Sequence, residues 1–94
     1  MLYTFSESVY DSVELERYFQ LLTDRDAVVL WQNGVVLLLK YPHLFTKKNS
    51  ASCYVMEADI RARGLKNMIP SFVNLISMSE FVTLTEQFSP QIAL

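Results

Sequence analysis

The segment 26–35, Asp-Ala-Val-Val-Leu-Trp-Gln-Asn-Gly-Val, constrains the fold of this chain more than any other. Residues 27–31 are all apolar, which is typical of a strand covered on both faces in a parallel sheet flanked by helices. Gln32-Asn33-Gly34 follow. Asn favours a helix N-cap and Gly permits close backbone approach, so we expect a strand-to-helix turn at the carboxyl edge of the sheet, where open α/β folds place ligands and partners. Asn-Gly is also a hairpin signal, with 35–39 as an alternative return strand.

Residues before this segment predict one strand and one helix. Residues 2–5 are rich in aromatic and β-branched side chains, as in a short strand. Asp11 and Glu14 have the spacing of a capping box, and the apolar residues that follow recur with a helical period. The buried side of this helix is predicted to contain Leu15, Tyr18, Phe19 and Leu22.

The segments after Gly34 continue the alternation of helix and strand. We expect a short buried helix over 35–41, a third strand over 53–56, a helix over 57–63 with Gly64 as its left-handed C-cap, and a fourth strand over 72–76. Ser77 and Glu80 have capping-box spacing, and Phe81, Leu84 and Phe88 give the last helix an apolar side that ends near Pro90.

This order of elements, β-α-β-α-β-α-β-α, predicts an α/β fold. Right-handed crossovers between parallel strands make a small three-layer sandwich with a mostly parallel sheet the economical topology. We expect a single domain, 1–94, without a linker or internal repeat. Hydrophobic residues make up 51% of the chain, which is a heavy apolar load for 94 residues, so we expect part of it to face another subunit.

The charge and the cysteine content of the chain exclude several classes of function. The formal net charge is -2 with no long block of one sign, so the electrostatic pattern of a free-standing nucleic-acid binder is missing. One cysteine excludes an internal disulfide framework and a multi-Cys metal site, which fits a reducing compartment. Residues 1–5 lack the basic and apolar regions of a signal peptide, and the apolar runs 27–31 and 35–39 are far shorter than the roughly 20 residues that span a bilayer.

Two single side chains are candidate reactive groups. Cys53 is the only thiol and would serve as a nucleophile or persulfide carrier if its pKa were lowered. It begins a predicted strand with no histidine nearby in sequence, which favours a structural role in packing. His43 follows Pro42 in a predicted loop, and one histidine without a second ligand at metal spacing favours an exposed loop residue over a metal ligand.

Other candidates are polar surface groups. Gln32-Asn33-Gly34 is a candidate anion site at a helix N-terminus, although it lacks the phosphate-loop patterns. Asp59, Arg61 and Arg63 either present charge to a partner or form a solvated helix face. Lys47 and Lys48 lie in a predicted surface loop and are expected to be solubilising.

Several motifs together resemble the TusB/DsrH family. They are the opening Met1-Leu2, the strand end Leu30-Trp31-Gln32-Asn33-Gly34-Val35, the segment 54–65 (Tyr-Val-Met-Glu-Ala-Asp-Ile-Arg-Ala-Arg-Gly-Leu), and Phe81-Val82-Thr83-Leu84-Thr85 with Pro90-Gln91. The resemblance covers nearly the whole chain. The chain departs from the family pattern in two places. Residues 88–94 differ from the common ending of the family, and residues 20–26 lack a cysteine that some DsrH members carry in that region.

The resemblance implies a flavodoxin-like α/β sandwich and a structural role in a cytoplasmic persulfide relay for 2-thiolation of a tRNA wobble uridine. The partners would be sister C and D subunits in a TusBCD-like heterohexamer, with the relay cysteine on the D subunit and tRNA contacted only indirectly. Whether the isolated chain forms a homo-oligomer in place of these partners is left open by the sequence. It implies no catalytic, cofactor or metal residue in this chain. The alternatives are a sulfurtransferase that uses Cys53 and a DsrH-like subunit of a sulfur-oxidation complex. We take six residues as interface candidates. Four lie in the turn at the sheet edge and two on the helix predicted over 57–63: Gln32, Asn33, Gly34, Val35, Asp59 and Arg63.

Overall fold

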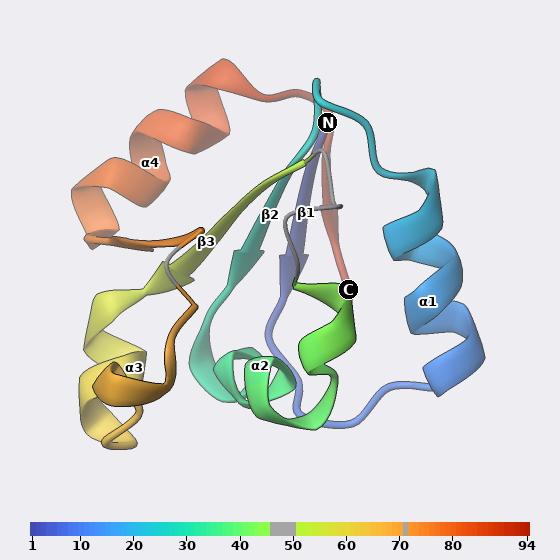
Figure 1. Cartoon of the computed structure of the whole chain (residues 1–94). Coiled ribbons are helices and arrows are strands. Elements are labelled where there is room, and N and C mark those ends of the chain that lie inside the picture. The colour runs from blue at the N-terminus through green and yellow to red at the C-terminus, as the bar shows by residue number, and fades with distance from the viewer. Residues whose placement is uncertain (46–50, 71) are drawn as a thin grey trace.

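The computed structural model describes residues 1–45, 51–70 and 72–94 and contains a five-stranded parallel sheet (Figure 1). The strands are β1 (Leu2–Phe5), β2 (Ala27–Leu30), β3 (Ser52–Met56), β4 (Val73–Ile76) and β5 (Gln91–Ala93), in the spatial order β4-β3-β2-β1-β5. Each neighbouring pair is parallel. The predicted strand after Asp26 is therefore the central strand of the sheet.

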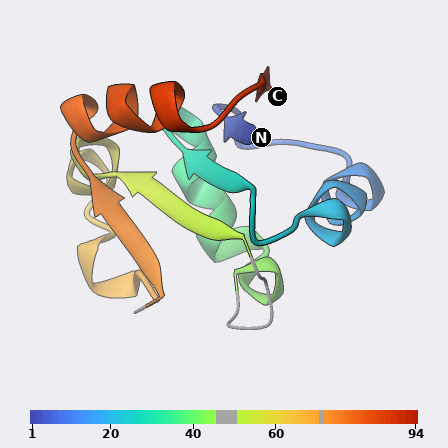
Figure 2. The ribbon, with the colours of Figure 1, turned by 90° about the horizontal axis from the view of Figure 1, so that it is seen from above.

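The helices form the outer layers of the fold. They are α1 (Ser12–Leu21), α2 (Leu37–Lys40), α3 (Glu57–Ala62) and α4 (Met78–Gln87), with short 3-10 helices η1 (Gln32–Val36), η2 (Pro42–Leu44) and η3 (Lys66–Met68). The first three α-helices cover one face of the sheet, and α4 lies on the other (Figure 2). The predicted three-layer α/β sandwich is confirmed.

Strand β2 shows why an unbroken apolar run was needed at the centre. Val28 and Leu30 belong to the larger hydrophobic cluster, which packs against α1, α2 and α3. Ala27 and Val29 alternate with them and belong to the smaller cluster under α4. All four side chains are 0–1% exposed, so neither face of the strand tolerates a polar residue.

Local capping signals fix the ends of the two long helices. The Asp11 side chain accepts hydrogen bonds from the backbone N–H groups of Val13 and Glu14 at 3.0 and 3.1 Å. Ser77 and Glu80 form the complete capping box that their spacing predicts. Gly64 follows α3 with φ +65°, a left-handed conformation that glycine adopts without a steric penalty.

The structure corrects three sequence-based expectations. The predicted order stopped at four strands, whereas β5 pairs with β1 as a fifth. Residues 35–39 form helical turns, so the hairpin alternative is wrong. Asn33 was expected as an N-cap, but Trp31 occupies that position before η1 without a side-chain hydrogen bond. The predicted loop with Lys47 and Lys48 lies outside the described residues.

Across the described part of the chain, no helix combines the length and the apolar character required to cross a membrane.

Candidate functional site

The turn after β2 is held tightly against the neighbouring strand β1. The Trp31 N–H donates to the Phe5 carbonyl at 3.1 Å, and the Gly34 N–H donates to the Trp31 carbonyl at 2.9 Å. A Cβ atom placed on Gly34 would lie 1.9 Å from the Phe5 carbonyl oxygen. Glycine is required here because the backbone of β1 occupies the space of any side chain.

Residues of α3 fix the outer part of the same turn. Gln32 has φ +53°, which is uncommon for a residue other than glycine. Its backbone N–H donates to Asp59 Oδ2 at 2.8 Å. Arg63, which directly follows α3, donates from Nη2 to Asn33 Oδ1. The structure therefore brings four of the six predicted interface residues into one polar cluster at the carboxyl edge of β2 and β3.

The other two predicted interface residues lie beneath this cluster. Gly34 and Val35 are buried, with Val35 0% exposed in the larger core cluster. Gln32, Asn33 and Arg63 are exposed. These three residues therefore present their side chains to solvent at this edge, and Gly34 and Val35 support the turn from below. An interface role for the six residues stays a prediction.

Cys53 lies on β3 in the larger core cluster. Its side chain is 6% exposed, and its Sγ lies 3.9 Å from the Ala51 carbonyl oxygen. Burial raises the pKa of the Cys53 thiol to about 11. The thiolate is the nucleophilic form of cysteine, so at neutral pH this side chain is a neutral, covered thiol.

The remaining sequence candidates lie apart from the turn. His43 is exposed on η2, and its Nε2 lies 2.8 Å from Glu16 Oε1 on α1. Arg61 pairs with Glu57 one turn earlier on α3. Among the residues that the structure describes, no group of three or more His, Cys, Asp or Glu side chains is arranged to hold a metal ion.

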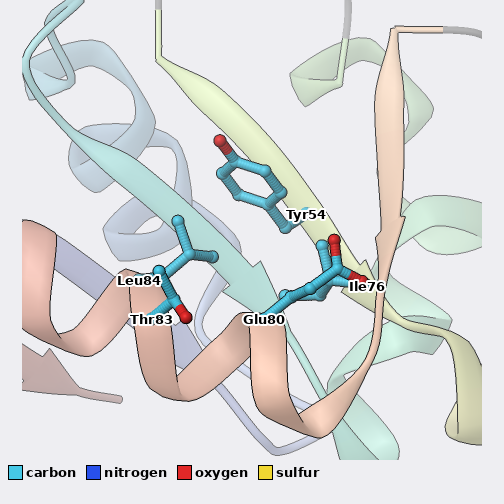
Figure 3. A pocket seen from close by; sticks show the side chains of 5 residues that line it. All are labelled: Tyr54, Ile76, Glu80, Thr83 and Leu84. Atoms are coloured by element: carbon cyan, nitrogen blue, oxygen red, sulfur yellow. The ribbon is translucent and has the colours of Figure 1, made fainter.

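Sequence reasoning missed a groove on the other face of the sheet. The groove has a volume of about 200 Å³ and lies between α4 and the strands β3 and β4 (Figure 3). Its lining consists of Tyr54, Ile76, Glu80, Thr83 and Leu84. The apolar side predicted for α4 showed where that helix packs. It did not show that the helix leaves part of the sheet uncovered.

The parallel sheet, its two helical layers and the fixed polar turn at its carboxyl edge define a small three-layer α/β protein. Comparison with known proteins gives the family. The family model described as "DsrH like protein" matches residues 7–91. Proteins named TusB from Yersinia pestis and Yersinia pseudotuberculosis are each 39% identical over 95 residues, which is 99% of both chains. An uncharacterized protein of Haemophilus influenzae is 48% identical over 96 residues, which is 100% of both chains. The chain belongs to the TusB/DsrH family.

Proposed function

We propose that this chain is a non-catalytic subunit of a cytoplasmic sulfur-relay complex that supports 2-thiolation of a tRNA wobble uridine. Membership of the TusB/DsrH family and 39% identity to proteins named TusB support this assignment. In the proposed complex, a cysteine of a sister subunit carries the persulfide. This chain contributes a folded surface that holds its neighbours in place.

The state of Cys53 is the observation on which the non-catalytic role depends. A persulfide carrier must present a thiolate to an incoming sulfur donor and then release the sulfur to an acceptor. Cys53 is 6% exposed, and burial raises its pKa to about 11. It is also the only cysteine of the chain, so no second thiol of this subunit replaces it.

The polar cluster at the carboxyl edge is the proposed contact with a sister C or D subunit. Asp59 and Arg63 hold Gln32 and Asn33 in a fixed conformation before a partner arrives. A preformed turn loses less conformational entropy on binding than a flexible one. Its exposed amide and guanidinium groups are suited to the polar rim of a subunit interface.

A complementation experiment in the native source tests the proposal. The gene is deleted and restored as the wild type, as Cys53→Ala and as Cys53→Ser, and 2-thiouridine is measured in nucleosides from purified tRNA. Deletion should remove the thiolated nucleoside, and all three genes should restore it. The alanine variant is included because a serine hydroxyl buried without a partner lowers stability.

Two results would contradict the proposal. Unchanged 2-thiouridine after deletion would overturn the tRNA assignment. Failure of both Cys53 variants, at protein levels equal to the wild type, would show that this chain carries sulfur through its own thiol.

A further inference from the structure

The two faces of the sheet are covered unequally. Within residues 1–45, 51–70 and 72–94, three α-helices pack against one face and α4 is the only helix on the other (Figure 2). Five strands at a spacing of about 4.8 Å span about 19 Å, whereas a helix with its side chains is about 10 Å wide. One helix therefore covers about half the width of this sheet, and a closed α/β layer has room for a second.

The part of this face that α4 leaves open is the groove over β3 and β4, beside α4. The side chain of Tyr54 rises from β3. Leu84 lies beside it on α4, and Ile76 lies on β4 (Figure 3). Asn74 is exposed and pairs in register with Tyr54. The lining of the groove thus combines apolar side chains (Ile76, Leu84) with polar ones (Glu80, Thr83), which matches the mixed character of interfaces between separately folded subunits.

The charge of this surface selects among possible occupants. Among the described residues that line the groove, Glu80 is charged and none is basic, and α4 carries a second carboxylate, Glu86, but no Lys or Arg. Two copies that met through α4 would bring these carboxylates together. A second copy that used a different surface would make a head-to-tail contact, which extends into a ring or an open filament.

We propose that the groove formed by Tyr54, Ile76, Glu80, Thr83 and Leu84 holds an amphipathic helix of a sister subunit, with a Lys or Arg of that helix beside Glu80. This inference rests on the proposed function for the identity of the partner. The incoming helix completes the layer that α4 begins. Its apolar side packs on the half-buried ring of Tyr54, and its cationic side chain pairs with Glu80.

The test measures the affinity of the full chain for the purified C and D sister subunits. Glu80→Gln removes the charge and retains the capping box, because Gln at this position also accepts from the Ser77 N–H. We expect it to raise the Kd about two- to fivefold at low salt and less at high salt, as for one solvent-accessible ion pair.

A matched pair at Thr83 tests the sign of the charge. Thr83→Lys and Thr83→Glu add similar bulk at an exposed groove position. We expect Thr83→Lys to weaken binding about fivefold or more relative to Thr83→Glu, because only the lysine repels a cationic partner. Val13→Lys is the control, since Val13 is an exposed β-branched residue of the ten-residue helix α1 on the opposite face.

The outcomes separate this inference from the proposed function. If the sister subunits bind all variants like the wild type, the groove is not their docking site, and the relay role stands. If Thr83→Glu binds more weakly than Thr83→Lys, the proposed charge of the partner is wrong. Self-association of the isolated chain that Thr83→Lys abolishes would assign the groove to a second copy and overturn the inference.

Discussion

The burial of Cys53 predicts that its thiol reacts much more slowly in the folded protein than in the unfolded chain. Burial raises its pKa from an ordinary value of 9.0 to about 11. Each pKa unit is a tenfold change in the thiolate population, so the folded protein holds about 100-fold less thiolate at neutral pH. The 6% exposure of the side chain slows attack further.

Alkylation by iodoacetamide, followed by mass spectrometry of the intact protein, measures this effect. The rate is compared at pH 7.5 in buffer and in a denaturing concentration of guanidinium. We expect the native rate to be at least about 100-fold lower, since each pKa unit corresponds to a factor of ten in thiolate. Because the unfolded thiol ionises at lower pH, the fold should also lose stability as the pH rises from about 9 towards 11.

A native rate within about threefold of the denatured rate would refute the reasoning, because neither the covering of Cys53 nor the suppression of its thiolate would then hold in solution. A circular dichroism spectrum recorded during the reaction serves as the control. It shows that the slow reaction belongs to the folded chain.

Three stability predictions follow from other contacts. Gly34→Ala should lower the free energy of unfolding by more than about 2 kcal/mol in urea titrations, because its Cβ would lie 1.9 Å from the Phe5 carbonyl oxygen; an unchanged midpoint would contradict this packing. Ser77→Ala should cost about 1 kcal/mol through loss of the α4 cap, and no loss would disprove the cap. Burial acts to raise the pKa of Asp26, but hydrogen bonds from Thr23 and the nearby N-terminal ammonium outweigh it, and the pKa is lowered from 3.8. The lowered pKa of Asp26 therefore adds to the free energy of unfolding above pH 3.8, and this contribution is lost as the pH falls through the lower pKa of the folded state. The difference in stability between the wild type and Asp26→Asn should thus shrink on acidification.

Local patterns in the sequence were sufficient to predict much of the architecture. The apolar run 27–31 predicted a strand covered on both faces, and β2 is that strand at the centre of the sheet. Ser77 and Glu80 predicted the start of α4, because a capping box involves residues only three positions apart. These features depend on close neighbours in the chain.

Features that depend on distant segments were harder to predict. The three residues of β5 follow Pro90 and show no strand pattern, and they become a strand by pairing with β1 at the opposite end of the chain. Asn33 was expected as a helix cap because it follows a strand, but its side chain bonds to Arg63, 30 residues later. The predicted order of parallel strands placed β2 beside β3. It did not show which polar atoms meet at the carboxyl ends of these two strands.

The groove was not predicted because periodicity describes one helix at a time. Leu84 on the apolar side of α4 indicated burial, and it is buried. Whether one helix is wide enough for the sheet depends on the number of strands, and β5 increased that number.

The location of the single thiol inside the core has a practical consequence for mapping the assembly. Since Cys53 is the only cysteine, a folded Cys53→Ala protein would contain none. A new cysteine introduced at Asn33 or Thr83 would then be the only attachment point for a cross-linker or a fluorescent probe. Each of the two proposed contact surfaces can thus be labelled separately in the intact complex, and the neighbour that each one touches can be identified directly.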